Sequence, residues 1–156
     1  MVKLKTLDWI TQDESMAASL EKWQRVVDIM TNLLGATAGY IIEYNEKHGY
    51  RAALTSQNPE NPNPCVSDKP EPLDSNIYCR RVIQSKLALY EPDAAGKPEW
   101  ADNPELTEDG YVSYLGIPLL WPNGTVFGTL CAFDKKPTGY DQSLQELMGV
   151  FRDLIE

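Results

Sequence analysis

The sequence has few of the residues from which metal and thiol sites are built. Its 156 residues include one histidine, His48, and three cysteines, Cys65, Cys79 and Cys131. The cysteines are widely spaced with no C-x-x-C pair, and His48 has no cysteine or histidine close to it in the sequence. Because a structural zinc site needs four such ligands at short spacings, this pattern excludes one. A chain of this length can bury most of its apolar surface without disulfides or metals.

Positive charge is also scarce. There are 14 lysines and arginines against 23 aspartates and glutamates, a formal net charge of −9. Such a surface repels phosphate groups, so we expect neither nucleic acid nor an anionic membrane surface as a partner. Long apolar runs are absent too, and none approaches the roughly 20 residues that span a bilayer. The N-terminal segment MVKLKTLDWITQDE lacks the apolar core of a signal peptide, so we expect one cytoplasmic domain over residues 1–156.

Two amphipathic helices are predicted near the ends of the chain. The tetrad TQDE at residues 11–14 has the pattern of a capping box, which predicts a helix over residues 11–34. Gly35 follows it as a C-terminal stop. Towards the other end, Asp141 or Ser143 can cap a helix that stays apolar up to its last residues. Both helices carry more apolar residues than a single packed stripe requires.

The residues between these helices indicate short strands separated by proline-rich loops. β-Branched and aromatic residues favour the strands, while prolines exclude helix and central strand from two long segments. Asp74 or Ser75 can cap one further helix. In chain order, the predicted elements are strand 39–44, strand 50–55, loop 57–73, helix 75–86, strand 87–90, loop 91–109 and a hairpin over 113–134. Paired strands with flanking helices predict an α+β fold around a central antiparallel sheet.

The hairpin SYLGIPLLWPNGTVFGTLCAFD, residues 113–134, is the most regular part of the sequence. Its turn is predicted at PNG, residues 122–124, with glycine in a left-handed position. Its first strand is apolar at both alternating sets of positions, Leu115, Ile117 and Leu119 in one set and Tyr114, Pro118 and Leu120 in the other. Successive residues point to opposite faces, so both faces must be buried. We expect the terminal helices on one face, and the 75–86 helix with the long loops on the other.

This hairpin and the segments before it resemble a GAF domain. The resemblance rests on Y-x-SYLGIPL at 111–119, WPNG at 121–124 and FGTLCAFD at 127–134, with IYC-x-x-VI at 77–83 and LYEPDA at 89–94. It covers nearly the whole chain. It implies a sheet of about five or six strands, with the terminal helices on one face and a ligand cavity on the other. It also implies a sensory domain cut from a longer signalling protein, of the kind found upstream of diguanylate cyclases and histidine kinases.

Six residues are expected around the ligand cavity of such a fold: Tyr78, Cys79, Trp100, Tyr111, Ser113 and Tyr114. Aromatic rings with polar ends suit a small organic ligand, whose identity the sequence does not give. The two long loops would admit it, and their many carboxylates favour a neutral or cationic molecule. Alternatively, the rings pack into one another and fill the cavity, and the domain is a dimerisation scaffold that binds no ligand.

No catalytic residue is predicted, and the sequence leaves the cofactor unknown. One enzymatic branch of the GAF family reduces free methionine sulfoxide, with a nucleophilic cysteine and a resolving partner on the cavity loops. Cys79 lies near one cysteine position of that branch, but residues 91–111 contain no cysteine. The simplest expectation is that Cys79 and Cys131 are small buried residues of the core. Two sulfurs close together across a pocket would favour the reductase instead. The patterns of bilin-binding and cyclic-nucleotide-binding members are not found, and His48 is expected in an exposed turn, away from any haem.

The apolar surplus on the terminal helices predicts a homodimer. One stripe of each helix faces the sheet, and a second copy of the chain can cover the remainder about a two-fold axis. The residues expected at this interface are Met16, Trp23, Met30, Phe151 and Ile155. Because the same central strands support the cavity and the helices, ligand binding is expected to shift the helix pair.

Overall fold

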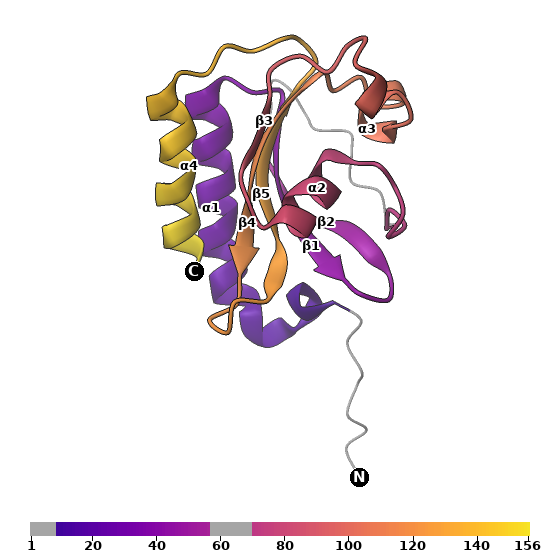
Figure 1. Ribbon diagram of the computed structural model, residues 1–156. Coiled ribbons are helices and arrows are strands. Elements are labelled where there is room, and N and C mark those ends of the chain that lie inside the picture. Colours follow the sequence, from indigo (N-terminus) through magenta and orange to yellow (C-terminus); the bar gives the residue numbers. More distant parts are fainter. Residues whose placement is uncertain (1–8, 57–69) are drawn as a thin grey trace.

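The computed structural model describes residues 9–56 and 70–156, which form a five-stranded antiparallel sheet with helices on both faces (Figure 1). The strands lie in the order β2-β1-β5-β4-β3. Their bounds are β1 Ala38–Asn45, β2 Gly49–Thr55, β3 Leu89–Glu91, β4 Ser113–Leu120 and β5 Val126–Asp134. The predicted α+β fold with a central antiparallel sheet is confirmed, and five strands lie within the expected number.

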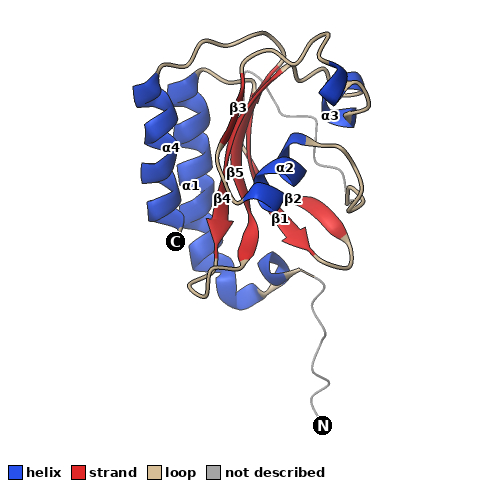
Figure 2. Ribbon diagram, in the orientation of Figure 1, coloured by secondary structure: helices blue, strands red, loops and turns tan. Residues whose placement is uncertain are grey.

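The helices are divided between the two faces of the sheet. Helices α1 Ala17–Leu34 and α4 Gln142–Ile155 lie side by side on one face, and α2 Tyr78–Ser85 and α3 Pro104–Thr107 lie on the other (Figure 2). Helices α1 and α4 run in opposite directions, so the start of α1 and the end of α4 lie at the same end of the pair (Figure 1). No helix in the described part of the chain is long and apolar enough to cross a bilayer.

The alternation of side chains along the central strands sorts the interior into two cores. On the α2 face, Tyr114 and Gly116 of β4 lie opposite Phe133 and Cys131 of β5. The core on this face contains Tyr40, Ile42, Tyr50, Ile77, Tyr78, Cys79, Val82, Ile83, Ala94, Trp100, Tyr111, Tyr114, Cys131 and Phe133. The core under α1 and α4 contains Val26, Val27, Met30, Leu34, Ile41, Leu115, Ile117, Leu119, Phe127, Leu130, Ala132, Met148 and Phe151. The hairpin is therefore buried on both faces, as predicted.

The N-terminal helix begins at Ala17 rather than at Thr11, so the predicted capping box is wrong. Residues 10–12 and 14–16 form short 3-10 helices instead. Thr11 donates its hydroxyl to the buried carboxylate of Glu43 on β1, at 2.5 Å, and the amide of Ile10 donates to the same carboxylate at 2.8 Å. These bonds hold the segment against the sheet, where it cannot continue the helix. The end of the helix is as predicted, because Gly35 has a φ of 61°.

Helix α2 begins at Tyr78, whereas the prediction placed its start at Asp74 or Ser75. The cap comes from another element: the amide of Tyr78 donates to Oε1 of Glu105, on α3, at 2.9 Å. Such a cap cannot be predicted from the residues next to the helix. At the C-terminal helix the local prediction is confirmed, since the side chain of Asp141 accepts a bond from the amide of Leu144 at 2.9 Å.

The structure describes one of the two predicted loops fully and only the end of the other. Residues 91–109, predicted to be irregular, contain a short 3-10 helix at Pro98–Trp100 and helix α3, each with a proline at its start. Most of the predicted loop 57–73 lies outside the described residues, and so does Cys65. Its last residues rejoin the sheet, where the amide and carbonyl of Glu71 form two hydrogen bonds with Tyr50.

Two of the five residues predicted at a dimer interface lie in the core instead. Met30 is fully buried and Phe151 is 6% exposed, because both face the sheet. Met16, Trp23 and Ile155 are partly exposed. The prediction therefore placed Met30 and Phe151 on the wrong side of their helices. The apolar side chains that do point outwards are described below.

Helix α1 can approach β1 closely because β1 has a glycine beneath it. A Cβ atom on Gly39 would collide with the side chain of Thr31 and would lie 2.9 Å from Cε of Met30. We expect Gly39→Ala to lower the free energy of unfolding by about 1–3 kcal/mol, the usual effect of overpacking a core. Urea unfolding followed by circular dichroism measures this.

The matched control for this variant is Gly139→Ala, because nothing lies within 4 Å of a Cβ atom at Gly139. Its stability should stay within about 0.5 kcal/mol of wild type, as for most surface substitutions. Equal effects of the two substitutions would show that the approach of α1 to β1 is not constrained at Gly39.

Candidate functional site

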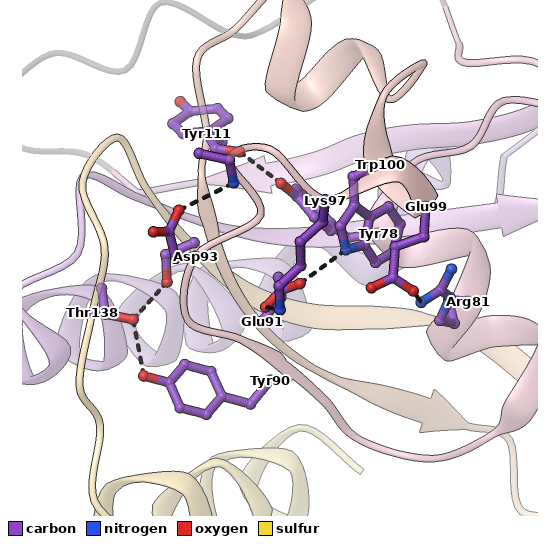
Figure 3. Close-up of polar contacts among 12 residues, drawn as sticks. Tyr78, Arg81, Tyr90, Glu91, Asp93, Lys97, Glu99, Trp100, Tyr111 and Thr138 are labelled. Carbon is purple, nitrogen blue, oxygen red and sulfur yellow. Dashed lines mark hydrogen bonds and ion pairs between the residues drawn. The ribbon is translucent and has the colours of Figure 1, made fainter.

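Five of the six predicted site residues meet between α2, the sheet and the loop that follows β3. The ring of Tyr78, on α2, lies 4.6 Å from that of Trp100 and 5.0 Å from that of Tyr114, centroid to centroid. The hydroxyl of Tyr78 donates to the carbonyl of Tyr111 at 2.7 Å (Figure 3). Cys79 lies beneath these rings. All five side chains are buried and the rings contact one another rather than solvent, which is the packing expected of the alternative, a dimerisation scaffold.

Trp100 is the one member of this cluster that a loop supplies. Its indole N–H donates to Oε1 of Glu91, at 3.0 Å, and the other oxygen of Glu91 pairs with Nζ of Lys97 at 2.9 Å (Figure 3). On its outer side, the guanidinium of Arg81 lies 4.1 Å from the ring centroid, a cation–π contact. The loop thus holds the indole between Tyr78 and Arg81 through one buried carboxylate.

Ser113 does not join this cluster. It is adjacent to Tyr114 on β4, so its side chain points to the opposite face. Its hydroxyl lies 2.5 Å from that of Thr138, which is 3.0 Å from the hydroxyl of Tyr90. The hydroxyl of Tyr90 also accepts a bond from the amide of Tyr140, at 2.8 Å. Ser113 therefore connects β4 to the segment that leads into α4.

The two described cysteines lie close together below the aromatic rings. Sγ of Cys79 on α2 is 4.0 Å from Sγ of Cys131 on β5, and both thiols are free. Burial acts to raise the pKa of Cys79, but hydrogen bonds from Cys131, Thr129 and Tyr114 lower it overall. For Cys131, burial and the neighbouring Cys79 raise the pKa well above its usual range. The two thiols therefore differ in acidity, and Cys79 is the more acidic.

Sequence reasoning missed two carboxylates at this site. Glu91 binds Trp100 and Lys97, and Glu105 caps α2, although the sequence distinguishes neither from the many other carboxylates of the long loops. The one sequence signal for either side chain was that Glu91 directly follows the predicted strand 87–90, where a residue can be held against the sheet. Burial, followed by the nearby acidic groups of Cys79, Asp109 and Glu71, raises the pKa of Glu105 well above its usual value.

No metal or haem ligand set is found in the described ranges. No group of three histidine, cysteine, aspartate or glutamate side chains there is arranged to hold a metal ion. His48 lies in the β1–β2 turn, where its ring is 6.2 Å from that of Trp9. It therefore lies away from the cluster around Tyr78, as the sequence indicated.

Comparison with known proteins agrees with this architecture. A model of the GAF domain family matches residues 23–155, most of the chain. The chain belongs to the GAF domain family. A sequence comparison with curated proteins found no match. The fold is shared with the GAF domain of the Acinetobacter phosphoenolpyruvate-protein phosphotransferase, at 17% identity and a TM-score of 0.65, covering 89% of this chain and 90% of that one.

Other GAF-fold structures differ widely in what they do. This GAF domain is similar to the free methionine-R-sulfoxide reductase of Neisseria meningitidis, solved with its substrate, at 14% identity and a TM-score of 0.68, covering 94% and 80% of the two chains. It is also similar to the chromophore-binding domain of the R. palustris bacteriophytochrome RpBphP3, at 8% identity and a TM-score of 0.68, covering 93% and 56%. At such identities the likeness establishes the fold and leaves the function to the site.

The raised pKa of Glu105 makes stability depend on pH in a predictable direction. Because the folded state holds the proton more tightly than the unfolded chain, the contribution of Glu105 to stability is greatest in acid and is lost as pH rises. Glu105→Gln keeps an oxygen that can accept the amide of Tyr78 but removes the charge. We therefore expect this variant to match wild type near pH 4 and to be more stable than wild type at pH 8, in urea unfolding.

Glu108→Gln is the matched control, since Glu108 is an exposed carboxylate next to α3. Its difference from wild type should be the same at the two pH values. A Glu105→Gln difference that does not grow between pH 4 and pH 8 would mean that the carboxylate is solvated in the folded domain.

Proposed function

We propose that this GAF domain is a non-enzymatic sensory module, which binds a small ligand at the cluster of Tyr78, Cys79, Trp100, Tyr111 and Tyr114. Binding changes the position of the terminal helices. The observation that carries the proposal is a continuous set of contacts from this cluster to the start of α4.

The contacts begin at Tyr78, whose hydroxyl holds the carbonyl of Tyr111 just before β4. Two residues later the hydroxyl of Ser113 meets that of Thr138, and Thr138 meets Tyr90 (Figure 3). Tyr90 in turn holds the amide of Tyr140, next to the residue that caps α4. A displacement of α2 or of residues 111–113 therefore has a direct physical route to α4. Such a route transmits a signal only if the ligand favours one of two arrangements.

A ligand would enter the cluster at the position that Trp100 occupies. Trp100 belongs to a loop, so it can leave the cluster without breaking a strand, and loops on a rigid sheet commonly carry binding residues. Its departure would uncover the ring of Tyr78 and would free one oxygen of the Glu91 carboxylate. An aromatic wall with a carboxylate favours a small planar molecule that is neutral or positively charged.

Two observations favour a binding module over an enzyme. Both described cysteines are buried, and the histidine lies in the β1–β2 turn, so no exposed thiol with a neighbouring histidine is found among the described residues. The proximity of Cys79 and Cys131 is the feature that would fit a reductase. Turnover of free methionine sulfoxide with a dithiol reductant would contradict the non-enzymatic part of the proposal.

The outer side of the terminal helix pair supports a homodimer. Four large apolar side chains are about half exposed there: Ile29 at 53% and Leu33 at 56% on α1, Val150 at 54% and Leu154 at 48% on α4. Each pair is four residues apart, so both pairs form a stripe along their helix. These residues replace Met30 and Phe151 in the proposed interface. A second copy of the chain would bury both stripes at once.

Native mass spectrometry of the purified chain tests ligand binding. We expect a fraction of the wild-type protein to carry the additional mass of a small molecule, which denaturation releases. Trp100→Ala should lose this mass by at least about tenfold in occupancy, since removing an aromatic contact of this kind costs more than about 1.4 kcal/mol.

Trp121→Ala is the control for that experiment, because Trp121 packs in the β4–β5 turn against Phe127, which belongs to the core under α1 and α4. It should retain the small molecule. If every sample gives only the mass of the bare chain while forming dimers, the domain is the dimerisation scaffold, and the ligand proposal is wrong.

Charged substitutions on the helix stripes test the dimer. Leu33→Asp and Leu154→Asp should each raise the dissociation constant at least about tenfold in sedimentation equilibrium, because each would bury a charge in an apolar interface. Leu87→Asp, at a residue that is 67% exposed beyond α2, should leave the dissociation constant unchanged. A wild-type chain that is monomeric throughout the micromolar range would overturn the proposed dimer.

A further inference from the structure

The thiols of Cys79 and Cys131 are placed as a pair inside the core, between two elements that are distant in sequence. Cys79 comes from the first turn of α2 and Cys131 from the middle of β5. Their sulfurs lie 4.0 Å apart, and neither residue has any exposed surface. Hydrophobic packing alone does not require two thiols to face each other at this point.

The surroundings of the two sulfurs are unequal. Sγ of Cys79 is approached by two hydroxyl donors, Oη of Tyr114 at 3.4 Å and Oγ1 of Thr129 at 3.5 Å. Sγ of Cys131 lies 3.8 Å from the carbonyl of Tyr40, to which its own S–H can donate. The hydroxyl of Thr129 is farther from Sγ of Cys131, at 3.8 Å, than from that of Cys79. Donors stabilise a thiolate, whereas a carbonyl acceptor keeps a thiol protonated. Cys79 is thus arranged as the nucleophile and Cys131 as its protonated partner.

A glycine makes room for one of these donors. Gly116 lies two residues after Tyr114 on β4 and opposite Cys131 on β5. A Cβ atom on Gly116 would collide with the phenol of Tyr114. The ring therefore lies along the strand, over Gly116, and its hydroxyl reaches Cys79. The bond between the hydroxyl of Tyr114 and Sγ of Cys79 therefore depends on the space that Gly116 leaves opposite Cys131.

We propose that Cys79 and Cys131 form a dithiol that hydrogen peroxide oxidises to an intramolecular disulfide. In the first step Sγ of Cys79 attacks a peroxide oxygen and the O–O bond breaks. Cys79 becomes a sulfenic acid, and the other oxygen leaves as water with the thiol proton. In the second step Sγ of Cys131 attacks Sγ of Cys79 and the S–O bond breaks. The hydroxide leaves with the proton of Cys131 as a second water.

The burial of both sulfurs selects the oxidant. Glutathione disulfide and protein disulfides would have to bring a bulky sulfur into contact with Cys79, which the rings above it prevent. Hydrogen peroxide is close to water in size and needs only the local openings that folded proteins undergo. The dithiol should therefore respond to peroxide and not to disulfide exchange.

The disulfide would change the position of α2. An S–S bond is about 2.05 Å long, so the two sulfurs must approach by roughly 2 Å. The movement draws the first turn of α2 towards β5, and with it Tyr78, which is bonded to the carbonyl of Tyr111. The oxidation itself does not depend on the proposed ligand, whereas its effect on α4 uses the same contacts as the proposed function.

Intact-mass analysis of a Cys65→Ser chain tests the proposal, because this background contains only the two cysteines in question. After exposure to hydrogen peroxide, the folded chain should lose the mass of two hydrogen atoms. Both thiols should become resistant to alkylation in denaturant, and peptide mapping should give one Cys79–Cys131 cross-link. Glutathione disulfide at the same concentration should leave both thiols reduced.

Two outcomes would overturn the proposal. One is the addition of oxygen to single cysteines without a cross-link. The other is a folded chain whose thiols stay reduced while the urea-unfolded chain is oxidised, since the thiols would then be inert residues of the core. Both readouts use the Cys65→Ser chain alone, so they do not require a variant of Cys79 or Cys131 to fold.

A matched pair of tyrosine variants tests the role of the donor on Cys79. Tyr114→Phe removes the hydroxyl next to Sγ, and we expect disulfide formation to slow roughly tenfold, the effect of losing one hydrogen bond to a charged group. Tyr50→Phe removes a hydroxyl from another buried tyrosine of the same core, one that bonds the carbonyl of Leu73 instead, and the rate should stay within about twofold of the parent. Equal rates for the two variants would contradict the assignment of Cys79 as the nucleophile.

Discussion

The structure depends on one constraint, the burial of the β4–β5 hairpin from both sides. Alternate side chains of each strand pack into two separate cores. The residues of both strands are therefore buried, except for the one next to the turn in each strand. Leu115 and Ile117 support α1 and α4, while Tyr114, next to Leu115 in the strand, supports α2. Because protein interiors are packed as densely as crystals, the strand cannot move for one core without moving for the other. The sheet is thus a shared wall between the cluster around Tyr78 and the terminal helices.

Three carboxylates attach the remaining segments to this wall. Glu43 on β1 holds the segment before α1, Glu91 at the end of β3 holds Trp100, and Glu105 holds the start of α2. Each accepts a hydrogen bond from an N–H group that lies outside the regular hydrogen-bond pattern of a helix or a strand. A buried carboxylate requires such donors, since an unpaired charge in a core is costly. The acidic composition of the chain is therefore partly structural, because these side chains organise segments that have little apolar surface of their own.

The sequence was sufficient for features that depend on neighbouring residues. The alternation in residues 113–120 predicted burial of both faces, Gly35 predicted the end of α1, and Asp141 predicted the start of α4. It failed where a distant residue decides the local structure. The start of α1 is set by Glu43 and that of α2 by Glu105, and neither can be found by inspecting a helix boundary. Helical periodicity also could not distinguish the inward Met30 from the outward Ile29, because both belong to a broad apolar stripe.

The candidate site shows the same limit. The grouping of Tyr78, Trp100, Tyr111 and Tyr114 followed from the family resemblance together with the positions of aromatic residues. Their direct contact with one another did not, because ring packing depends on how α2 and a loop meet in space. Ser113 was assigned to the wrong face of β4, although its adjacency to Tyr114 would have indicated the opposite face. The proximity of the two thiols could not be predicted at all, since it requires the register of β5 against the position of α2.

The pairing of β1 with β5 also fixes the order in which the domain can be completed. Ala38 pairs with Phe133, so β1 cannot pair until β5, the last strand of the sheet in chain order, is available. Until residues 126–134 are available, β1 and β4 each present an open edge, and the core under α1 lacks Leu130 and Ala132. Contacts between such distant residues make folding slow, and open strand edges are where chains aggregate. During synthesis on the ribosome, the residues before β5, about four fifths of the chain, must remain unfinished and soluble until this strand emerges.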